Sequence, residues 1–387
     1  MTDFYARPTR GELEKLVGAA MLAPSPDNNQ PWLFEEQPEG GLLLCHDLTR
    51  ALPSDVHFMF SMIALGAALE NLCIASRQCS WEPEVNYVLR DQASRQASSS
   101  NPHMHSPQVG ERQPIARIRF RYGGHSDPLY PLPLLAQRIT CRKPYSRRAP
   151  PDTLLESLTQ AADNSADIQV HWLKERSAIR ALSPMIAASD RVRFEYRSFH
   201  QELYRQLRFS EGEAERTKDG LDIRTLEVPP GTGLLLRFLR SWKRMQIFNW
   251  LGLSLLLTLP SALAVWRSGV IGLITVAKPT PASFLQGGRS FQRLWLTATG
   301  HGLSLQPLGS LPIFLGHLEL LAGQHLDERH RRRLTRIAEE FHELLPASRN
   351  RNLLIAFRLG YSVLPKVRSL RRHPSEVMNS PLSETDH

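Results

Sequence analysis

Hydrophobic residues at helical and strand spacing divide the first third of the chain into regular elements. Apolar residues three or four positions apart predict helices over 12–23 and 58–78. Short apolar runs predict strands over 33–34, 42–45 and 85–89, and the strict alternation of IARIRFR predicts a strand over 115–121. The polar residues 91–114 predict a loop. Small residues at 66–68 in the second helix predict close packing against another helix.

The rest of the chain repeats this order of elements at greater length. Helices are predicted over 152–161, with Asp152 as the N-cap, and over 177–209, 286–301 and 318–345. Strands are predicted over 168–173, 270–276 and 353–359. We therefore expect two similar halves, 1–125 and 126–387, with an apolar insertion at about 209–268 that makes the second half longer.

One segment within this insertion is uncharged over 245–266, MQIFNWLGLSLLLTLPSALAVW. It is long enough to span a membrane as one helix. However, it contains polar residues, Gly252 and Pro260, and the buried strand that follows requires a globular sheet. We favour two buried or lid-like helices, broken near 251–252 and at Pro260. Peripheral membrane contact is an open but less favoured alternative. It would involve the basic and aromatic residues Arg237, Arg240, Trp242, Lys243 and Arg244.

Overall charge narrows the classes of partner. The 387 residues carry a formal net charge of +9, which favours anionic ligands. The densest basic run, RHRRRLTR at 329–336, continues into a helical pattern and is typical of a solvated helix face, so nucleic acid is not expected. The four cysteines form no CxxC pair, and no metal site is expected. Free, buried cysteines and a polar N-terminal stretch predict a cytoplasmic protein.

Four segments carry candidate chemistry. The stretch APSPDNNQPW at 23–32 is too rich in proline and amide residues for the middle of a helix or strand. In RITCR at 138–142, two arginines flank a hydroxyl and can converge on one phosphate. The loop at 302–312, GLSLQPLGSLP, exposes backbone groups, and SLRRH at 369–373 supplies further cations. Taken singly, the two arginine segments are better explained as basic surface clusters, and the loop at 302–312 can be a structural turn.

Together, these segments resemble the signatures of the flavin-dependent nitroreductase superfamily. The resemblance rests on PSPDNNQPW at 24–32, on Arg138-x-Thr140-x-Arg142, on the loop at 302–312, and on Gly360-Tyr361 before Arg371-Arg372. It covers about residues 12–378. The first half has the amide motif and the second half has the arginine motif, as in the double-length, Acg-like branch, where one chain imitates a dimer. The resemblance implies an α+β nitroreductase-like fold of two fused halves, each with a mainly antiparallel sheet flanked by helices.

The resemblance also implies the cofactor FMN and the residues that bind it. Its phosphate and ribityl chain would be held by Arg138, Thr140, Arg142, Arg371 and Arg372. The isoalloxazine and ribityl region would be lined by Pro24, Ser25 and Asn28 from the other half, and the ring by Pro307, Leu308 and Gly309. No catalytic side chain is required, because the flavin carries the chemistry.

Three functions follow from the resemblance. The first is an FMN oxidoreductase that passes two electrons from NAD(P)H to a nitro compound, a quinone or another small acceptor. The second is a protein that sequesters or stores FMN beneath the insertion, with little turnover. The third is an FMN-dependent biosynthetic dehydrogenase. A fused pseudo-dimer is compatible with either a monomer or a homodimer.

Overall fold

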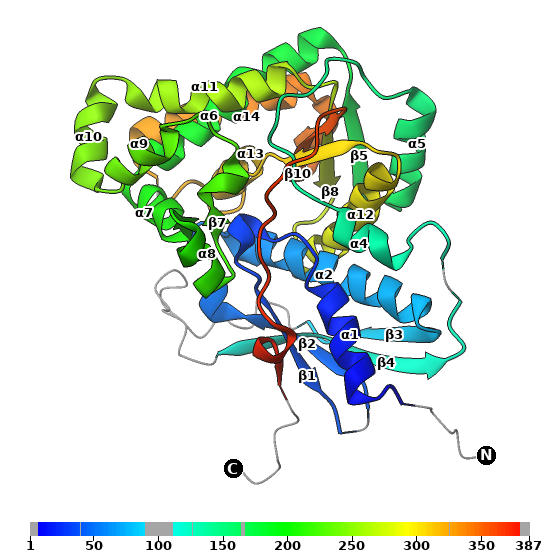
Figure 1. Ribbon diagram of the computed structural model, residues 1–387. Helices are drawn as coiled ribbons and strands as arrows, with labels where there is room; N and C mark the ends of the chain where they lie inside the picture. The colour runs from blue at the N-terminus through cyan, green and yellow to red at the C-terminus, as the bar shows by residue number, and fades with distance from the viewer. Residues whose placement is uncertain are drawn as a thin grey trace.

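The computed structural model describes residues 7–38, 40–89, 111–125, 127–163, 167–324 and 326–379. Two β-sheets form separate layers, and helices α2 (Met59–Gln78) and α12 (Pro281–Gly300) lie between them (Figure 1). The predicted α+β class, with two mainly antiparallel sheets flanked by helices, is confirmed. The exact division at 125/126 stays a prediction.

The lower sheet in Figure 1 is built mainly from the first half of the chain. Its strand order is β11-β1-β2-β4-β3, and all neighbours are antiparallel except β1 and β11, which are parallel. Its strands are β1 (Trp32–Glu36), β2 (Leu42–Asp47), β3 (Trp81–Tyr87), β4 (Arg112–Tyr122) and β11 (Met378–Asn379). The end of the chain therefore returns to the sheet that its beginning forms.

The upper sheet is antiparallel throughout, in the order β5-β8-β10-β9. Every residue of β8 is buried, which explains why its sequence, VIGLITV, is apolar without alternation. Its strands are β5 (Ile168–Leu173), β8 (Val270–Val276), β9 (Ser304–Pro307) and β10 (Asn352–Gly360). A short parallel pair, β6 (Leu207–Arg208) with β7 (Leu221–Asp222), lies in the insertion.

Helices cover both sheets. In and around the first sheet they are α1 (Arg10–Ala20), α2 and α4 (Leu132–Gln137). In the second half they are α5 (Asp152–Ala161), α6 (Arg176–Glu195), α7 (Arg197–Gln206), α8 (Glu211–Thr217), α9 (Thr232–Phe238), α10 (Trp242–Trp250), α11 (Leu253–Trp266), α12, α13 (Ser310–Glu319) and α14 (Glu328–Leu344). Short 3₁₀ turns connect several of them.

Several local predictions were wrong. The insertion breaks at 251–252 as expected, with a bend of 86°, but Pro260 lies inside α11 and does not break it. Asp152 is the first residue of α5 and Pro151 is its N-cap. The helical regions 177–209 and 318–345 are each interrupted, and Cys79 is exposed although the other three free cysteines are buried. Most of the predicted loop at 91–114 lies outside the described residues, and β4 begins within it.

The two layers meet where α2 crosses α12. A Cβ atom added to Gly66 would lie 2.0 Å from the carbonyl oxygen of Leu285, and one added to Gly288 would lie 2.1 Å from that of Ile63. The backbones therefore touch, as the small residues at 66–68 predicted. Buried polar pairs also cross this contact, because Gln292 Nε2 donates to Asn71 Oδ1 at 2.7 Å.

We predict that Gly288→Ala destabilises the protein by about 2 kcal/mol or more, because the backbone of α2 must move to admit the methyl group. Chemical denaturation measures this change. Gly212→Ala is the matched control: Gly212 lies in α8, and its added Cβ would meet nothing within 4 Å. The control should be neutral or stabilising by about 0.5–1 kcal/mol. Equal stability of the two variants would contradict the close contact.

Candidate functional site

The amide-rich stretch begins where α1 ends and has an unusual backbone. Asp27, Asn28 and Gln30 have φ values of 46°, 57° and 51°, in the left-handed region. Such backbone conformations are uncommon outside glycine and persist only when surrounding contacts fix them. Asn28 and Gln30 are also buried, with 6% and 0% of their surface exposed. Local bonds to Ser25 and Pro26 close a 3₁₀ turn here, and the side-chain amides are held by other segments.

Those contacts come from three distant parts of the chain. Gln30 Nε2 donates to the Lys218 carbonyl oxygen at 2.8 Å, and Gln30 Oε1 accepts from the Arg372 amide at 3.0 Å. Asn29 Nδ2 donates to the Arg50 carbonyl at 2.8 Å. Asn28 Nδ2 donates to the Leu370 carbonyl at 3.1 Å. The stretch thus joins the first half, the insertion and the C-terminal tail.

The C-terminal tail descends from β10 across the molecule to β1, drawn in red in Figure 1. On its way, Arg371 Nε donates to the Met21 carbonyl at 2.7 Å, and its Nη2 donates to the Ala23 carbonyl at 3.0 Å. Its Nη1 donates to Asn28 Oδ1 at 2.7 Å. Arg371 therefore lies at the carbonyl end of α1, which attracts cations.

Arg138 reaches the same end of α1 from the second half. Its Nη2 donates to the Leu22 carbonyl at 2.8 Å, and its guanidinium lies 4.5 Å above the ring of Trp295. Arg368 is close by, because its Nη1 donates to the Arg138 carbonyl at 3.2 Å. The predicted arginine motif, the tail and the end of α1 therefore meet in space.

These three arginines, Arg138, Arg368 and Arg371, form a cationic cluster. Among the described residues, none of them makes a salt bridge to a carboxylate. Burial, and then the charges of Arg371 and Arg368, hold the pKa of Arg138 well below its usual range. Burial, followed by Arg368, lowers the pKa of Arg371 to about 10. The Nε of Arg138 is buried without a hydrogen-bond partner in the described structure.

A buried cation without a counter-ion is costly, and backbone carbonyls offset only part of that cost. An anion with several acceptor oxygens would supply the missing charge and partners. The cationic cluster therefore fits a phosphate group, which is the group that the resemblance places beside Arg138 and Arg371.

Thr140 lies beside the third predicted segment. It forms a parallel bridge with Leu305 of β9, and the Cys141 amide donates to the Leu305 carbonyl at 3.1 Å. Of the predicted residues, Pro307 is the last of β9, and Leu308 and Gly309 form the loop after it. Leu308 is buried, and its amide donates to the Ala356 carbonyl at 2.7 Å. Because proline has no N–H, Gly309 is left as the amide donor of this loop.

Arg142 has different partners from Arg138. Its Nη1 donates to the Thr225 carbonyl of the insertion at 3.1 Å. Burial lowers the pKa of Arg142, although Asp27 and Glu227 act in the opposite direction. The two arginines of the motif thus face different neighbours. Arg372 is also separate from the cationic cluster, because its Nη2 donates to the carbonyls of Gln30 and Trp32 at 2.8 and 3.1 Å.

Helix α6 supplies two partly buried residues that the sequence analysis did not identify. Arg193 Nη2 pairs with Asp27 Oδ2 at 3.1 Å, and Asp190 accepts from the hydroxyl of Ser310, at the start of α13. Burial raises the pKa of Asp190. The helix thereby ties the amide stretch to the loop after β9. Its sequence gave no signal, because a charged pair three residues apart is common on helices.

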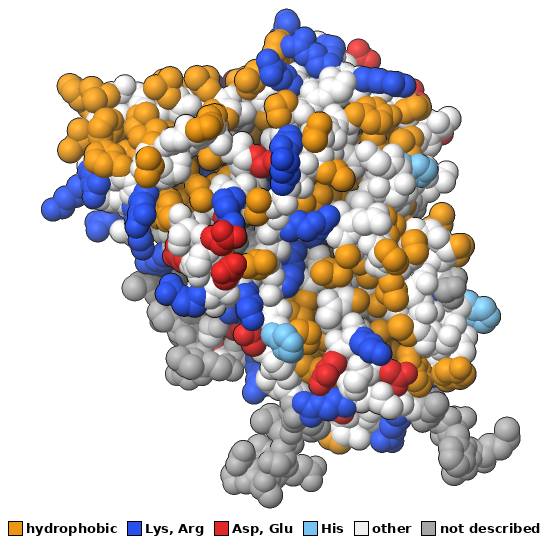
Figure 2. Space-filling view, viewed as in Figure 1, with side chains coloured by type: hydrophobic (Ala, Val, Ile, Leu, Met, Phe, Trp, Pro, Cys, Tyr) orange, Lys and Arg blue, Asp and Glu red, His pale blue; other side chains and the backbone are white. Residues whose placement is uncertain are grey.

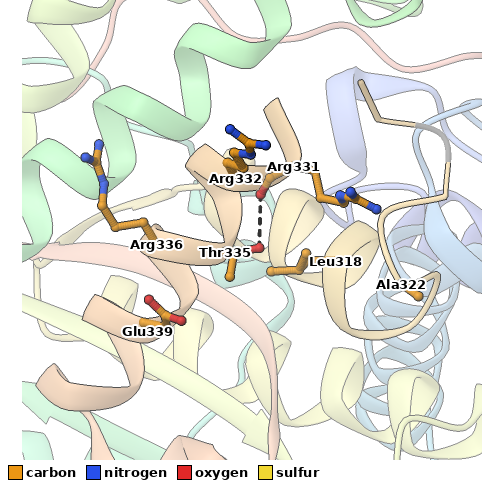
Figure 3. Close-up of a pocket in the computed structure, with 7 residues that line it drawn as sticks. All are labelled: Leu318, Ala322, Arg331, Arg332, Thr335, Arg336 and Glu339. Atoms are coloured by element: carbon orange, nitrogen blue, oxygen red, sulfur yellow. Dashed lines mark hydrogen bonds between the residues drawn. The ribbon is translucent and has the colours of Figure 1, made fainter. Parts of the chain in front are cut away.

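Surface pockets occur elsewhere in the described structure. A shallow hollow of about 400 Å³ lies between α14 and the end of α13, lined by Leu318, Ala322, Arg331, Arg332, Thr335, Arg336 and Glu339 (Figure 3). Another, of about 340 Å³, lies along α5. Neither is lined by a predicted site residue. Of the predicted residues, Asn28 and Arg142 are in contact with the insertion, through the Gly220 amide and the Thr225 carbonyl.

No protein-family model matches the chain. An uncharacterized protein from Mycobacterium tuberculosis, MT1398, is 27% identical over 372 residues, which cover 93% of this chain and 47% of that protein. The chain therefore spans about half the length of the curated relative it matches.

Solved structures with a similar arrangement include a candidate nitroreductase from Anabaena variabilis. It covers 91% of this chain and 88% of its own, with a TM-score of 0.44 and 8% identity. The FMN-dependent nitroreductase NfnB from Mycobacterium smegmatis, solved with NADPH, covers 64% of this chain and 95% of its own, with a TM-score of 0.36 and 16% identity.

We predict that Gln30→Leu destabilises the protein by roughly 2–4 kcal/mol, because it leaves the Lys218 carbonyl and the Arg372 amide buried without their partner. It should also speed tryptic cleavage at the tail arginines. Urea unfolding and timed proteolysis measure both effects. Gln37→Leu is the control, since the side chain of Gln37 makes only a local hydrogen bond among the described residues, of 3.4 Å to the Glu35 carbonyl. A tail equally protected in both variants would show that the amide stretch does not hold it.

Proposed function

We propose that this chain binds FMN where residues 21–28, 138–142, 305–309 and 368–371 meet, and that it is an FMN-dependent oxidoreductase of the nitroreductase type. The cationic cluster carries the proposal, because it gathers three positive charges without a carboxylate among the described residues. The phosphate of FMN would balance that charge. The amide stretch and the loop after β9, which the resemblance assigns to the same cofactor, lie around it.

Each part of the site would have its own role. Arg138 and Arg371 would hold the phosphate, since their guanidinium groups come together beside the end of α1 without a carboxylate partner in the described structure. Thr140 would add a hydroxyl donor beside them. Pro24, Ser25 and Asn28 would line the ribityl chain and ring from the first half. Asn28 would do so while fixed by Arg371, whose Nη1 donates to its Oδ1 at 2.7 Å.

The loop after β9 would lie along the ring. Leu308 would contribute apolar contact rather than a hydrogen bond, because its amide already donates to the Ala356 carbonyl. The Gly309 amide would be the donor to the flavin, and an N–H placed there favours negative charge on a reduced ring. Arg142 and Arg372 would contribute to the site indirectly, through their neighbours Asp27 and Gln30.

When bound, FMN supplies two-electron chemistry, accepting electrons from NAD(P)H and passing them to a nitro compound, a quinone or another small acceptor. The residues of this chain would bind and orient it and would exclude water. The choice of acceptor, a dehydrogenase role and a monomeric or dimeric state stay predictions.

Sequestration of FMN is the second candidate, and the insertion favours it. The segment between α8 and α9 lies on the site, because the Gly220 amide donates to the Asn28 carbonyl at 3.2 Å and the Thr225 carbonyl accepts from Arg142. Lys143 and Glu227 form an ion pair of 3.2 Å across the same contact. This segment would restrict access of a nicotinamide to the ring.

We predict that Arg138→Met and Arg371→Met each weaken FMN binding by about tenfold or more, because charge-assisted hydrogen bonds to phosphate are lost. Quenching of FMN fluorescence measures the affinity. Arg336→Met is the control, since it removes one charge from the solvated face of α14, where the Arg336 side chain is 73% exposed. Unchanged FMN affinity in both site variants, with the proteins folded, would contradict the proposal.

We predict that Glu227→Gln speeds the dissociation of FMN and its anaerobic reduction by NADPH, because the ion pair that holds the insertion on the site is broken. Stopped-flow absorbance at the flavin band measures both. Glu211→Gln is the control, since Glu211 pairs with Arg224 inside the insertion. Rapid bleaching of the unaltered protein supports the reductase. Bleaching confined to Glu227→Gln supports sequestration, and identical rates in all three proteins would contradict a restricting insertion.

A further inference from the structure

The bent pair of helices α10 and α11, with α9 beside them, carries an exposed apolar face. Of the eighteen large hydrophobic residues that are exposed in the described structure, ten lie between 234 and 263. Trp250, at the end of α10, is 87% exposed. We call this set the apolar face; it consists of Leu234, Leu235, Phe238, Ile247, Trp250, Leu251, Leu255, Leu256, Leu259 and Leu263. Figure 2 shows hydrophobic side chains gathered at the upper left, where Figure 1 places α9 and α10.

Helix α11 has its polar residues on the inside. Ser254 and Thr258 are 0% and 3% exposed, whereas Leu256 and Leu259 are 62% and 58% exposed. The inner residues bind α11 to the rest of the protein, because Ser254 Oγ donates to Glu195 of α6 at 2.9 Å. A helix on the surface of a water-soluble domain has the opposite polarity. The outer leucines are therefore placed for an apolar medium and not for the core.

The charge around the apolar face is of one sign. The sequence contains no aspartate or glutamate from 228 to 318. Lysine and arginine side chains lie along the lower edge of the face in Figure 2. Five exposed cations accompany α9, α10 and the end of α11: Arg237, Arg240, Lys243, Arg244 and Arg267. Such a combination of leucine, tryptophan and a basic rim is typical of elements that lie in the interface of an anionic bilayer.

The geometry fits a helix pair that lies on a membrane rather than one that crosses it. With nine and fourteen residues, α10 and α11 are about 14 and 21 Å long, shorter than the ~30 Å of a bilayer core. The bend of 86° prevents them from acting as one straight span. Moreover, α11 is bound to the body of the protein, because Ser183 Oγ of α6 donates to the Ala262 carbonyl at 2.8 Å.

The helical stretch Val56–Gln78 is also long and apolar enough to cross a membrane, but 89% of its most apolar window is buried. It contains α2, which lies between the two sheets, so its apolar sequence is explained by the core.

We propose that the apolar face binds the surface of a phospholipid bilayer that contains anionic lipids. Its leucines and Trp250 would enter the boundary between headgroups and acyl chains, and the basic rim would contact lipid phosphates. A second copy of this chain is a poorer partner, because the basic rims of two such faces would repel each other. The inference does not depend on flavin binding, since no residue of the cationic cluster takes part.

The test is flotation of the full chain with vesicles of phosphatidylcholine alone and of phosphatidylcholine mixed with phosphatidylglycerol. We expect binding to the mixed vesicles, and weaker binding at high salt. Leu251→Ser/Leu256→Ser should reduce the partition coefficient by roughly tenfold or more. Its control is Val363→Ser/Leu364→Ser, which alters residues that are 75% and 61% exposed elsewhere.

The basic rim is tested with Arg240→Gln/Lys243→Gln, which should weaken binding to the anionic vesicles by roughly tenfold. Arg332→Gln/Arg336→Gln is the control of equal charge on α14, where these side chains are 78% and 73% exposed. Failure of the folded protein to float with anionic vesicles would overturn the proposal. So would equal flotation of the Leu251→Ser/Leu256→Ser variant and the unaltered protein. A dimer that this variant dissociates, without any vesicle binding, would identify a second copy as the partner instead.

Discussion

Buried polar groups must be hydrogen-bonded, and this requirement organises the structure around residues 21–32. A short 3₁₀ turn satisfies some backbone amides of this stretch locally, but its side-chain amides are bonded to other segments. Gln30 contacts the insertion and the tail, and Asn29 contacts the turn at Arg50. Once these bonds are made, the beginning and the end of the chain are fixed beside the second half. The packing of β11 on β1 then follows, because the tail must pass this point to reach the first sheet.

The same convergence explains the electrostatics of the site. Arg138 arrives after α4, and Arg368 and Arg371 arrive with the tail, so three cations meet although Arg138 is more than two hundred residues from the other two in sequence. The carbonyl ends of helices attract them but cannot neutralise them. An anion at this place would convert a destabilising arrangement into a stabilising one, and this is the physical reason for proposing FMN. The proposal therefore rests on charge as much as on resemblance.

Much of the fold could be predicted from periodicity, because the buried strands and the packed helices have strong patterns. The sequence RITCR and the amide stretch could also be identified as chemically unusual, from their residue types. The partners of Arg142 could not be predicted, since Thr225 offers a backbone carbonyl and no side-chain signal. Asp190 and Arg193 were missed because their role depends on where α6 lies. Pro260 was misread as a break: it is in the middle of the fourteen-residue helix α11, which continues through it although proline cannot donate its own backbone hydrogen bond.

The insertion links the candidate site to the apolar face. Its segment at 218–227 contacts the site, and its helices α10 and α11 carry the apolar face outward. The central claim, however, is a single flavin site assembled from both ends of one chain. The most direct test is calorimetric titration of the flavin-free, purified protein with FMN, with the mass in solution determined in parallel. We predict one FMN bound per chain, whether the protein is a monomer or a dimer. Absence of binding, or two FMN per chain, would contradict a single composite site.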